Sequence, residues 1–270
     1  SFSGGGDTST FGPVRNPHNP DHLASGSSGG SAAALYYDDI DITIGGDQGG
    51  SIRMPASWCG VVGLKPTFGL VPYTGIAGID NTIDHTGPMA RTVADAALTL
   101  EVIAGKDPLD PRQGEVPVQP YTDVLGQSVD GLRRGVLKEG FGLPLSEADV
   151  DESVRRAMAI FGELGAITSD ISVPGHLEAA GIIWALIGEG AAAMVRSNGM
   201  GYHWPGQYNT GLAESLGKAR RAQGNDLPAT VKLVLLVGTY LSEKYHGRIY
   251  GKAQNLRPGL RSAYDRALEQ

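Results

Sequence analysis

Glycine is the residue type that most constrains what this chain can fold into. The sequence contains 40 glycines among 270 residues, which is about twice the usual share for a globular protein. Much of the excess lies between Gly4 and Gly87. Because glycine has no Cβ atom, it permits sharp turns and close backbone approaches that other residues resist. The sequence therefore predicts unusual backbone geometry in its first third.

The remaining composition is ordinary for a soluble globular protein and argues against several function classes. Hydrophobic residues make up 41% and charged residues 19%, which allows a sizeable core. The net charge is −7 with scattered lysine and arginine, whereas nucleic-acid binding needs a basic patch. The apolar runs at 179–187 and 231–237 are shorter than the ~20 residues that span a bilayer. Neither nucleic acid nor a membrane is expected as a partner, and the single cysteine, Cys59, favours the reducing cytoplasm.

Both ends of the sequence read as interrupted. The chain begins with Ser1 in a loop-like stretch, and residues 263–270 lie within an amphipathic helical pattern that has no terminating glycine or proline. We expect an internal piece of a longer protein.

The order of elements predicts an α/β fold. In the first 105 residues we expect a helix from near Ser28 through 37, a strand at 39–44, a glycine-rich turn at 45–51 and a helix at 92–104 capped by Thr92.

The pattern changes after residue 105. A connector rich in proline and aspartate spans 106–131, and a strand at 134–137, a helix at 149–164 and a strand at 167–173 follow. This order suggests a parallel crossover. The remainder is mainly helical, with a break at 197–210. The expected architecture is a mixed, mostly parallel central sheet flanked by helices.

Three glycine-spaced stretches could carry chemistry, namely residues 26–31, 45–53 and 59–67. In the second stretch, Gly49 and Gly50 permit a sharp turn in which consecutive backbone N–H groups face one point. Ser51 ends this turn, so its hydroxyl would lie beside those donors. Acyl transfer requires such a pair, a nucleophile with an oxyanion hole.

The base that a serine nucleophile needs is not apparent among the histidines. The stretch at 49–53 is not a G-x-S-x-G elbow, and the order of the chain fits none of the familiar triads. The six histidines show no helpful spacing: His18, His22, His85, His176, His203 and His246.

The three stretches, in this order and with these gaps, resemble the amidase signature family, which uses a Ser–cis-Ser–Lys triad. The resemblance implies that Ser51 is the nucleophile and that Ser27, 24 positions earlier, is the bridging serine beside an unusual cis peptide bond. It assigns the oxyanion hole to four backbone N–H groups, those of Gln48, Gly49, Gly50 and Ser51. It also implies three residues that brace the loop: Ser28, Asp47 and Arg53.

The resemblance extends beyond these motifs. Residues 63–71 and 82–97 also match the sequence pattern of the family, so roughly residues 20–105 are diagnostic of it. Residues 106–270 resemble more weakly one branch of the family, the amidases associated with nitrile hydratase. The implied organisation is a single partial amidase domain over 1–270. Within it, 1–105 form the nucleophile-bearing core, 106–131 the connector, and 132–270 a strand-helix-strand unit followed by a mainly helical substrate-side region.

One departure from the family pattern concerns the catalytic lysine. The family places it several dozen residues before the bridging serine, yet only 26 residues precede Ser27 and none is lysine. All seven lysines follow Ser51: Lys65, Lys106, Lys138, Lys218, Lys232, Lys244 and Lys252. The resemblance therefore implies a base that this sequence lacks, and we expect the chain alone to be inactive.

The function that the resemblance implies is hydrolysis of a small-molecule carboxamide to a carboxylate and ammonia, with no metal or organic cofactor. A homodimer of the full-length parent is left open. Three alternatives remain: the A subunit of a glutamyl- or aspartyl-tRNA amidotransferase, a non-catalytic fragment that is a folded remnant or a binding module, and an amidase acting on larger amides.

Several other residues have a structural interpretation beside a functional one. Cys59 is expected to be a buried thiol, Lys65 a structural cap, and His85 a structural histidine rather than a substrate ligand. The stretch at 26–31 lacks the Lys-Ser/Thr ending of a phosphate-binding loop. A final group could line an acyl pocket or simply pack: Trp184, Tyr202, His203, Trp204 and Tyr208.

Overall fold

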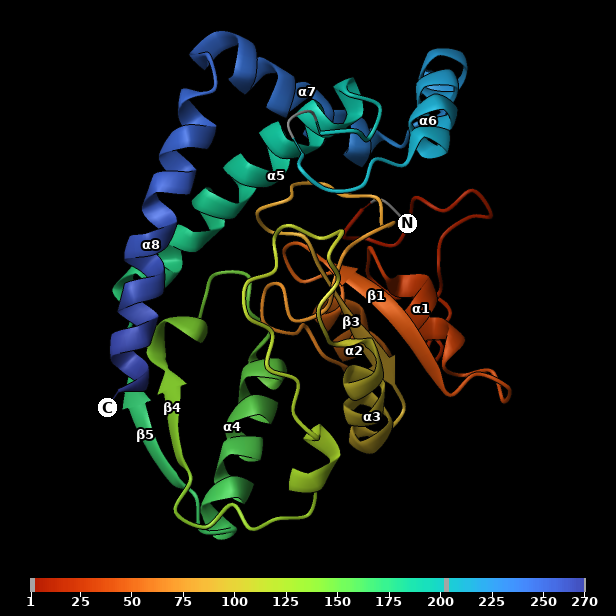
Figure 1. Ribbon diagram of the computed structural model, residues 1–270. Coiled ribbons are helices and arrows are strands. Elements are labelled where there is room, and N and C mark those ends of the chain that lie inside the picture. Colours follow the sequence, from red (N-terminus) through yellow and green to blue (C-terminus); the bar gives the residue numbers. More distant parts are fainter. Residues whose placement is uncertain (1–2, 202–203, 270) are drawn as a thin grey trace. The chain divides into compact units, whose positions relative to one another are not determined.

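The computed structural model describes residues 3–201 and 204–269 (Figure 1). The chain divides into two compact units, and each contains two separate segments of the sequence. The first unit comprises Ser1–Leu125 and Ile187–Lys244. The second comprises Gly126–Leu186 and Tyr245–Gln270.

A three-stranded antiparallel sheet organises the first unit. Its order is β1 (Ile42–Asp47), β3 (His85–Ala90) and β2 (Val62–Gly63). The register pairs Ile42 with Ala90 and Asp47 with His85. Three helices accompany this sheet: α1 (Gly29–Ala34), α2 (Arg53–Cys59) and α3 (Val93–Ile103).

The core of this unit lies between β1, β3 and the first two helices. Its fully buried members include Leu35 at the end of α1, Met89 of β3 and Cys59 of α2, with Ile52 between β1 and α2. Because β1 is paired with β3 and α2 contributes Ala56 and Cys59 to this core, the short loop that joins β1 to α2 is held at both ends.

Strand β1 lies three residues later than the sequence predicts, at 42–47 rather than 39–44. The pair Gly45-Gly46 reads as a turn by propensity, yet both residues continue the ladder opposite Gly87 and Thr86. Glycine is needed there for close approach, since an added Cβ on Gly45 would lie 2.9 Å from Cγ1 of Ile52. The expected turn at 45–51 is therefore shorter and begins after Asp47.

Two prolines of the first unit lie in elements that the pattern did not predict. Helix α2 contains Pro55, which is tolerated because it lies within the first turn of the helix. Strand β3 contains Pro88, which argues against a strand on propensity alone. In contrast, α3 begins as predicted, because the Thr92 hydroxyl accepts a hydrogen bond from the Asp95 N–H at 3.1 Å.

The rest of the first unit is largely helical. It includes η1 (Tyr121–Val124), part of α5 (Ala179–Arg196), α6 (Thr210–Gln223), η4 (Gly224–Asp226) and α7 (Ala229–Tyr245) up to Lys244. Helices α5 and α7 meet backbone to backbone, since a Cβ added to Gly238 would lie 1.9 Å from the carbonyl oxygen of Gly188. Glu189 also accepts a hydrogen bond from Ser242 at 2.9 Å.

Within the part of the chain that the structure describes, one helical segment, Pro174–Arg196, has the length and apolar composition that a membrane span requires. Core helices of soluble proteins meet the same criterion, and the buried Glu189 of this segment is hydrogen-bonded within the first unit.

The second unit contains a strand-helix-strand arrangement. Strands β4 (Arg133–Leu137) and β5 (Ile167–Ile171) pair in parallel, and α4 (Ala148–Glu163) connects them, which confirms the predicted parallel crossover. Short 3-10 turns follow each strand, at η2 (Lys138–Gly140) and η3 (Pro174–Glu178). Helix α8 (Arg248–Leu268) packs on η3 and supplies Tyr264, whose hydroxyl is hydrogen-bonded to His176.

The α/β class is therefore confirmed, with both kinds of strand pairing. Among the described residues, the parallel pairing is that of β4 and β5, whereas the larger sheet is antiparallel.

Candidate active site

Asp47, the last residue of β1, organises the loop that carries Ser51. Its buried carboxylate accepts hydrogen bonds from the N–H groups of Gly50 (2.7 Å) and Ile52 (3.2 Å). Arg53 adds two more, from Nε and Nη2, both at 3.0 Å. Burial alone would raise the pKa of Asp47, but Arg53 and the two N–H groups outweigh it and hold the pKa below its ordinary value. The loop from 48 to 52 therefore folds around an ionised carboxylate.

Gly50 makes this loop possible. Its φ of +130° lies in a region that side chains disfavour, and an added Cβ would lie 3.0 Å from Cγ of Met54. The turn brings Ser51 to a half-buried position, one residue before Ile52, the N-cap of α2.

The segment that contains Ser27 lies against the same loop. The Ser28 N–H donates to the Ser51 carbonyl oxygen at 3.2 Å, so the two serine-bearing segments are in direct contact. The Ser28 hydroxyl donates to the Gly46 carbonyl (3.2 Å) and accepts from the Gly46 N–H (3.0 Å), which fastens the segment to β1. The peptide bond between Gly26 and Ser27 is cis, as expected for this neighbourhood.

Gln48 extends from this loop toward a second group of buried polar residues. Its side-chain amide donates to the Tyr73 hydroxyl at 3.1 Å. The Asp84 carboxylate belongs to the same group, and Gln48 is among the polar groups that lower its pKa. That carboxylate further accepts from the N–H groups of Ile79, at 3.0 and 3.1 Å, and Asp80, at 3.3 Å. Burial raises the pKa of Asp84 to about 6, although these hydrogen bonds oppose the shift.

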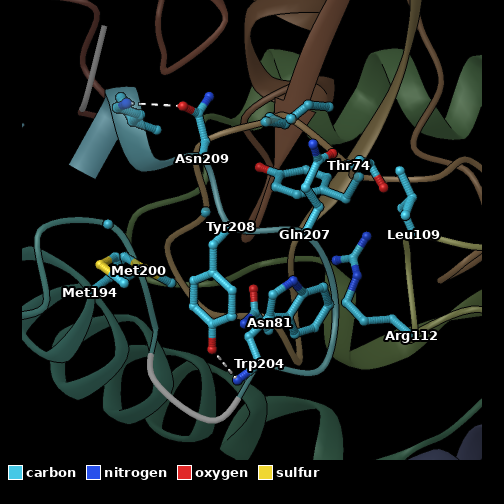
Figure 2. Close-up of a pocket in the computed structure, with 16 residues that line it drawn as sticks. Thr74, Asn81, Leu109, Arg112, Met194, Met200, Trp204, Gln207, Tyr208 and Asn209 are labelled. Carbon is cyan, nitrogen blue, oxygen red and sulfur yellow. Dashed lines mark hydrogen bonds between the residues drawn. The ribbon is translucent and has the colours of Figure 1, made fainter. Parts of the chain in front are cut away.

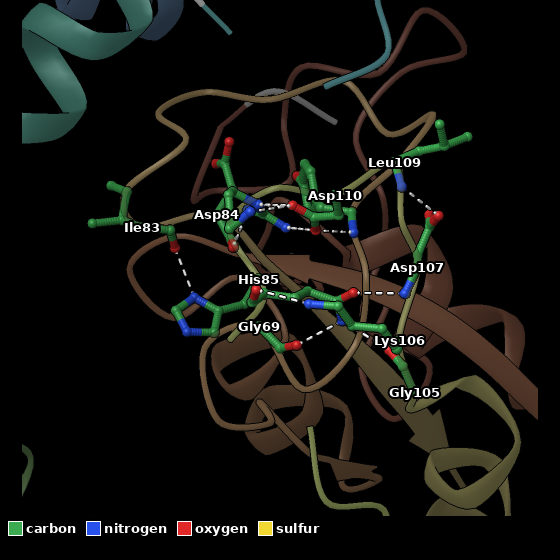
Figure 3. Close-up of polar contacts among 12 residues, drawn as sticks. Gly69, Ile83, Asp84, His85, Gly105, Lys106, Asp107, Leu109 and Asp110 are labelled. Carbon is green, nitrogen blue, oxygen red and sulfur yellow. Dashed lines mark hydrogen bonds and ion pairs between the residues drawn. The ribbon is translucent and has the colours of Figure 1, made fainter. Parts of the chain in front are cut away.

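A buried ion pair completes this polar group (Figure 3). The Arg112 guanidinium contacts both carboxylate oxygens of Asp110, at 2.9 and 2.7 Å, and donates to the Asp84 carbonyl at 2.9 Å. Both side chains of the pair are almost fully buried. Asp110 also accepts from the Tyr73 N–H at 2.8 Å. The positive charge of Arg112 is therefore neutralised within the fold.

A pocket in the first unit lies beside this group (Figure 2). Tyr73, Trp204 and Tyr208 give it aromatic walls, and the main-chain N–H of Trp204 donates to the Tyr208 hydroxyl at 2.9 Å. The other large side chains around it are apolar or uncharged apart from Arg112: Ile76, Leu109, Met194, Met200, Leu212, Thr74, Asn81, Gln207 and Asn209.

The residues suggested for an acyl pocket have different locations. Trp204 and Tyr208 line the pocket of Figure 2, whereas Trp184 is exposed and belongs to the second unit. Tyr202 and His203 lie outside the described residues.

The structural interpretations of three other residues agree with their contacts. Cys59 is fully buried, and burial raises the pKa of its thiol. His85 Nδ1 is hydrogen-bonded to the Ile83 carbonyl at 2.7 Å, and burial lowers the pKa of His85 (Figure 3). The Lys65 ammonium donates to the Pro66 carbonyl at 2.6 Å. Among the described residues, no group of three or more His, Cys, Asp or Glu side chains could hold a metal ion.

The chain belongs to the Amidase family, whose sequence profile matches residues 1–270. An enantioselective amidase from Rhodococcus rhodochrous is 44% identical to it, over 99% of this chain and 52% of that protein. The A subunit of the Glutamyl-tRNA(Gln) amidotransferase of Synechococcus sp. (strain RCC307) is 40% identical, over 98% of this chain and 54% of that protein.

The fold is also similar to solved structures of amidase signature enzymes. The crystal structure of a bacterial aryl acylamidase from this enzyme family superimposes with a TM-score of 0.80 and 26% identity, over 100% of this chain and 52% of that chain. The chain therefore spans about half the length of the relatives that it matches.

Proposed function

We propose that the protein is an amidase that converts a carboxamide to a carboxylate and ammonia through an acyl-enzyme on Ser51. The observation that carries the proposal is the contact between two serine-bearing segments, in which the Ser28 N–H donates to the Ser51 carbonyl. Membership of the Amidase family supports the same chemistry.

In the proposed mechanism, the Ser51 hydroxyl oxygen attacks the amide carbon while its proton passes to Ser27. Backbone N–H groups of residues 48–51 stabilise the negative charge that develops on the carbonyl oxygen. Ser27 then delivers a proton to the amine as the C–N bond breaks, which leaves an ester on Ser51. Water hydrolyses this ester by the reverse proton path. A lysine outside residues 1–270 is proposed to start and end the relay, so this chain alone is proposed to be inactive.

We further propose that the pocket of Figure 2 receives the acyl side of the substrate. Its aromatic and thioether walls favour an aromatic or bulky apolar group. Arg112 is paired with Asp110, so the pocket offers no uncompensated positive charge for a substrate carboxylate. A small-molecule amide is the proposed substrate, and the proposed location is the cytoplasm because Cys59 is a reduced thiol.

The second candidate is the A subunit of a tRNA-dependent amidotransferase. It is supported by the 40% identity to a protein of that name. The two candidates differ in substrate, because the amidase should accept simple aromatic and aliphatic amides. The amidotransferase component should instead prefer glutamine and need its partner proteins.

The nucleophile assignment can be tested in the full-length protein with Ser51→Ala. We expect loss of nearly all benzamide and propionamide hydrolysis, because the Ser51 hydroxyl is the proposed nucleophile. The midpoint of unfolding should not change, because the hydroxyl is not proposed to stabilise the fold. A fluorophosphonate probe should label Ser51. Ser57→Ala, at an exposed site on α2, is the matched control and should keep both activity and labelling. Full activity in Ser51→Ala would refute the assignment.

A further inference from the structure

We propose that His18 and Tyr36 are positioning residues, which join the C-terminal ends of α1 and α2 and thereby fix the spacing between Ser27 and Ser51. This inference rests on the proposed function, since it assigns the proton relay to those two serines. Both residues act through the two helices that follow the serines, not through contact with a substrate.

The first step of the argument is the placement of the two serines before the two helices. Helix α1 begins two positions after Ser27, at Gly29. Helix α2 begins two positions after Ser51, at Arg53. At these ends the Ser28 N–H donates to the Ser51 carbonyl oxygen at 3.2 Å. The serine-bearing ends of the two helices are therefore fastened to each other.

The second step is the contact between the opposite ends of the helices. Helix α1 ends at Ala34, and Tyr36 follows in the next turn of the chain. The Tyr36 hydroxyl donates to the carbonyl oxygen of Cys59, the last residue of α2, at 2.5 Å. The last carbonyl groups of a helix have no partner within that helix. The hydroxyl therefore supplies a donor that α2 cannot supply for itself, and it joins the two C-terminal ends.

The third step is that His18 reaches the same oxygen from a separate loop. Its Nε2 lies 2.9 Å from the Cys59 carbonyl oxygen and 2.6 Å from the Tyr36 hydroxyl oxygen. All three groups are satisfied together when Nε2 carries the ring hydrogen. The rings of His18 and Tyr36 also meet edge to face, with their centroids 4.9 Å apart. The histidine therefore holds the tyrosine against the end of α2.

The C-terminal end of α2 is shaped to receive these side chains. Gly60 follows the helix with a φ of +67°, and a Cβ added to it would lie 3.2 Å from Nε2 of His18 and 3.6 Å from the Tyr36 hydroxyl oxygen. Asn16, from the same loop as His18, donates from its side-chain amide to the Trp58 carbonyl oxygen at 2.7 Å. The last two carbonyl groups of α2 are therefore both held by side chains.

The contacts at the two ends together determine the spacing of the serines. Tyr36 lies eight positions after Ser28, and Cys59 lies eight positions after Ser51. At ~1.5 Å per helical residue the two spans match, so the helices run in the same direction and are joined at both ends. Loss of the C-terminal contact leaves the spacing to the Ser28 bond and to apolar contacts, which are not directional. A shift of the helices then changes the distance over which a proton passes from Ser51 to Ser27.

The experiment uses the double variant His18→Leu with Tyr36→Phe in the full-length protein. Its substrates are benzamide and 4-nitrophenyl benzoate, which share an acyl group and differ in the leaving group. The amine needs a proton to leave and nitrophenolate does not, so displaced serines slow the amide far more than the ester. We expect kcat/KM to fall about 10- to 100-fold for benzamide and less than about threefold for the ester.

Amide hydrogen exchange shows whether the contact itself is lost. In the double variant, exchange in residues 57–61 should accelerate at least about tenfold, because the end of α2 opens more often without its side-chain donors.

Two further variants separate this effect from general damage. His22→Leu with Tyr37→Phe makes the same chemical changes at exposed side chains of neighbouring segments, and it should leave exchange and both substrates at wild-type values. If the first double variant fails to fold, Tyr36→Phe alone removes the hydroxyl and keeps the ring. It should lower the ratio of amide to ester kcat/KM at least about threefold.

The inference and the proposed function fail in different ways. Wild-type exchange in residues 57–61 would overturn the inference whatever the activity. An unchanged ratio of amide to ester kcat/KM would also overturn it, because a purely structural role lowers both reactions equally. Benzamide hydrolysis that survives Ser51→Ala would instead overturn the proposed function, while the exchange result would still report on the contact between the helices.

Discussion

The Asp47 side chain has a different role from the carboxylates on the surface of the first unit. It is buried and bonded to two loop N–H groups and to Arg53, whereas Asp41 pairs with Arg91 in a setting where most of its side chain is in solvent. A buried carboxylate that loses its charge leaves its donors without an equivalent acceptor. An exposed pair is screened by water.

We therefore expect Asp47→Asn to lower the free energy of unfolding by about 2–4 kcal/mol. The same change at Asp41 should have a much smaller effect, because solvent already screens that pair. Chemical denaturation of both variants at neutral pH measures the difference. Equal losses at the two positions would show that Asp47 does not organise the loop.

Asp84 makes the free energy of unfolding depend on pH with the opposite sign to Asp47. Its pKa is raised from 3.8 to about 6 in the folded protein, so the folded state binds the proton more tightly than the unfolded state does. The contribution of Asp84 to the free energy of unfolding is therefore largest below about pH 4, and it is lost as the pH rises through about 6. The shift of about two units corresponds to about 3 kcal/mol.

The comparison of wild type with Asp84→Asn isolates this contribution, because other carboxylates titrate equally in both. Between pH 4.5 and 7 the stability of wild type should fall relative to that of the variant. Urea denaturation at several pH values gives the two curves. Parallel curves would mean that Asp84 has an ordinary pKa.

At the scale of elements, sequence reasoning succeeded where local signals coincide with the structure. Thr92 caps α3, and the order of β4, α4 and β5 gives a parallel pair. It failed where tertiary packing overrides propensity. Gly45 lies in a strand because Ile52 leaves no room for a side chain, and Pro88 lies in a strand between two others. Both residues pair with a neighbouring strand, so contacts distant in the sequence, rather than local propensity, decide their conformation.

Two glycines in neighbouring elements are expected to respond oppositely to alanine. Gly30 lies in α1, is exposed, and has nothing within 4 Å of an added Cβ. Gly30→Ala should stabilise the protein by about 0.5–1 kcal/mol. Gly50 has a φ of +130° and a crowded Cβ position, so Gly50→Ala should destabilise it by about 1–3 kcal/mol. Thermal unfolding of both variants measures the two changes in stability relative to wild type. A Gly50→Ala variant that is more stable than wild type would contradict the described turn.

At the scale of the whole molecule, the residues proposed for the site lie in motifs that are visible in the sequence, but the contacts around them could not be predicted. Ser27, Ser51 and Asp47 lie within short stretches whose spacing is visible in the sequence. The Tyr73 hydroxyl reaches the Gln48 side chain from 25 positions away. No local pattern predicts such contacts, since they depend on how the chain between β2 and β3 folds back.

The 270-residue chain by itself should hydrolyse benzamide and propionamide at least about 100-fold more slowly than the full-length protein, because general-base help is worth ~10²–10⁴ in rate. A nitrophenyl ester, whose leaving group needs no proton, should retain more of its turnover. Circular dichroism establishes that the chain is folded before the assay. Amide turnover at the full-length rate would contradict the prediction. In that case Lys65→Met would test whether this half-buried lysine, whose pKa is lowered by burial and by Arg53, acts as the base.

The contact between Gly188 and Gly238 has a consequence for how the pocket could change during evolution. Helices α5 and α7 are separated there by backbone atoms alone, so their spacing has no side chain to absorb an added methyl group. Met194, which lines the pocket, lies further along α5. A Gly238→Ala substitution would therefore displace α5 and, with it, the wall of the pocket that Met194 forms. The range of accepted substrates would then change without any substitution among the residues that line the pocket.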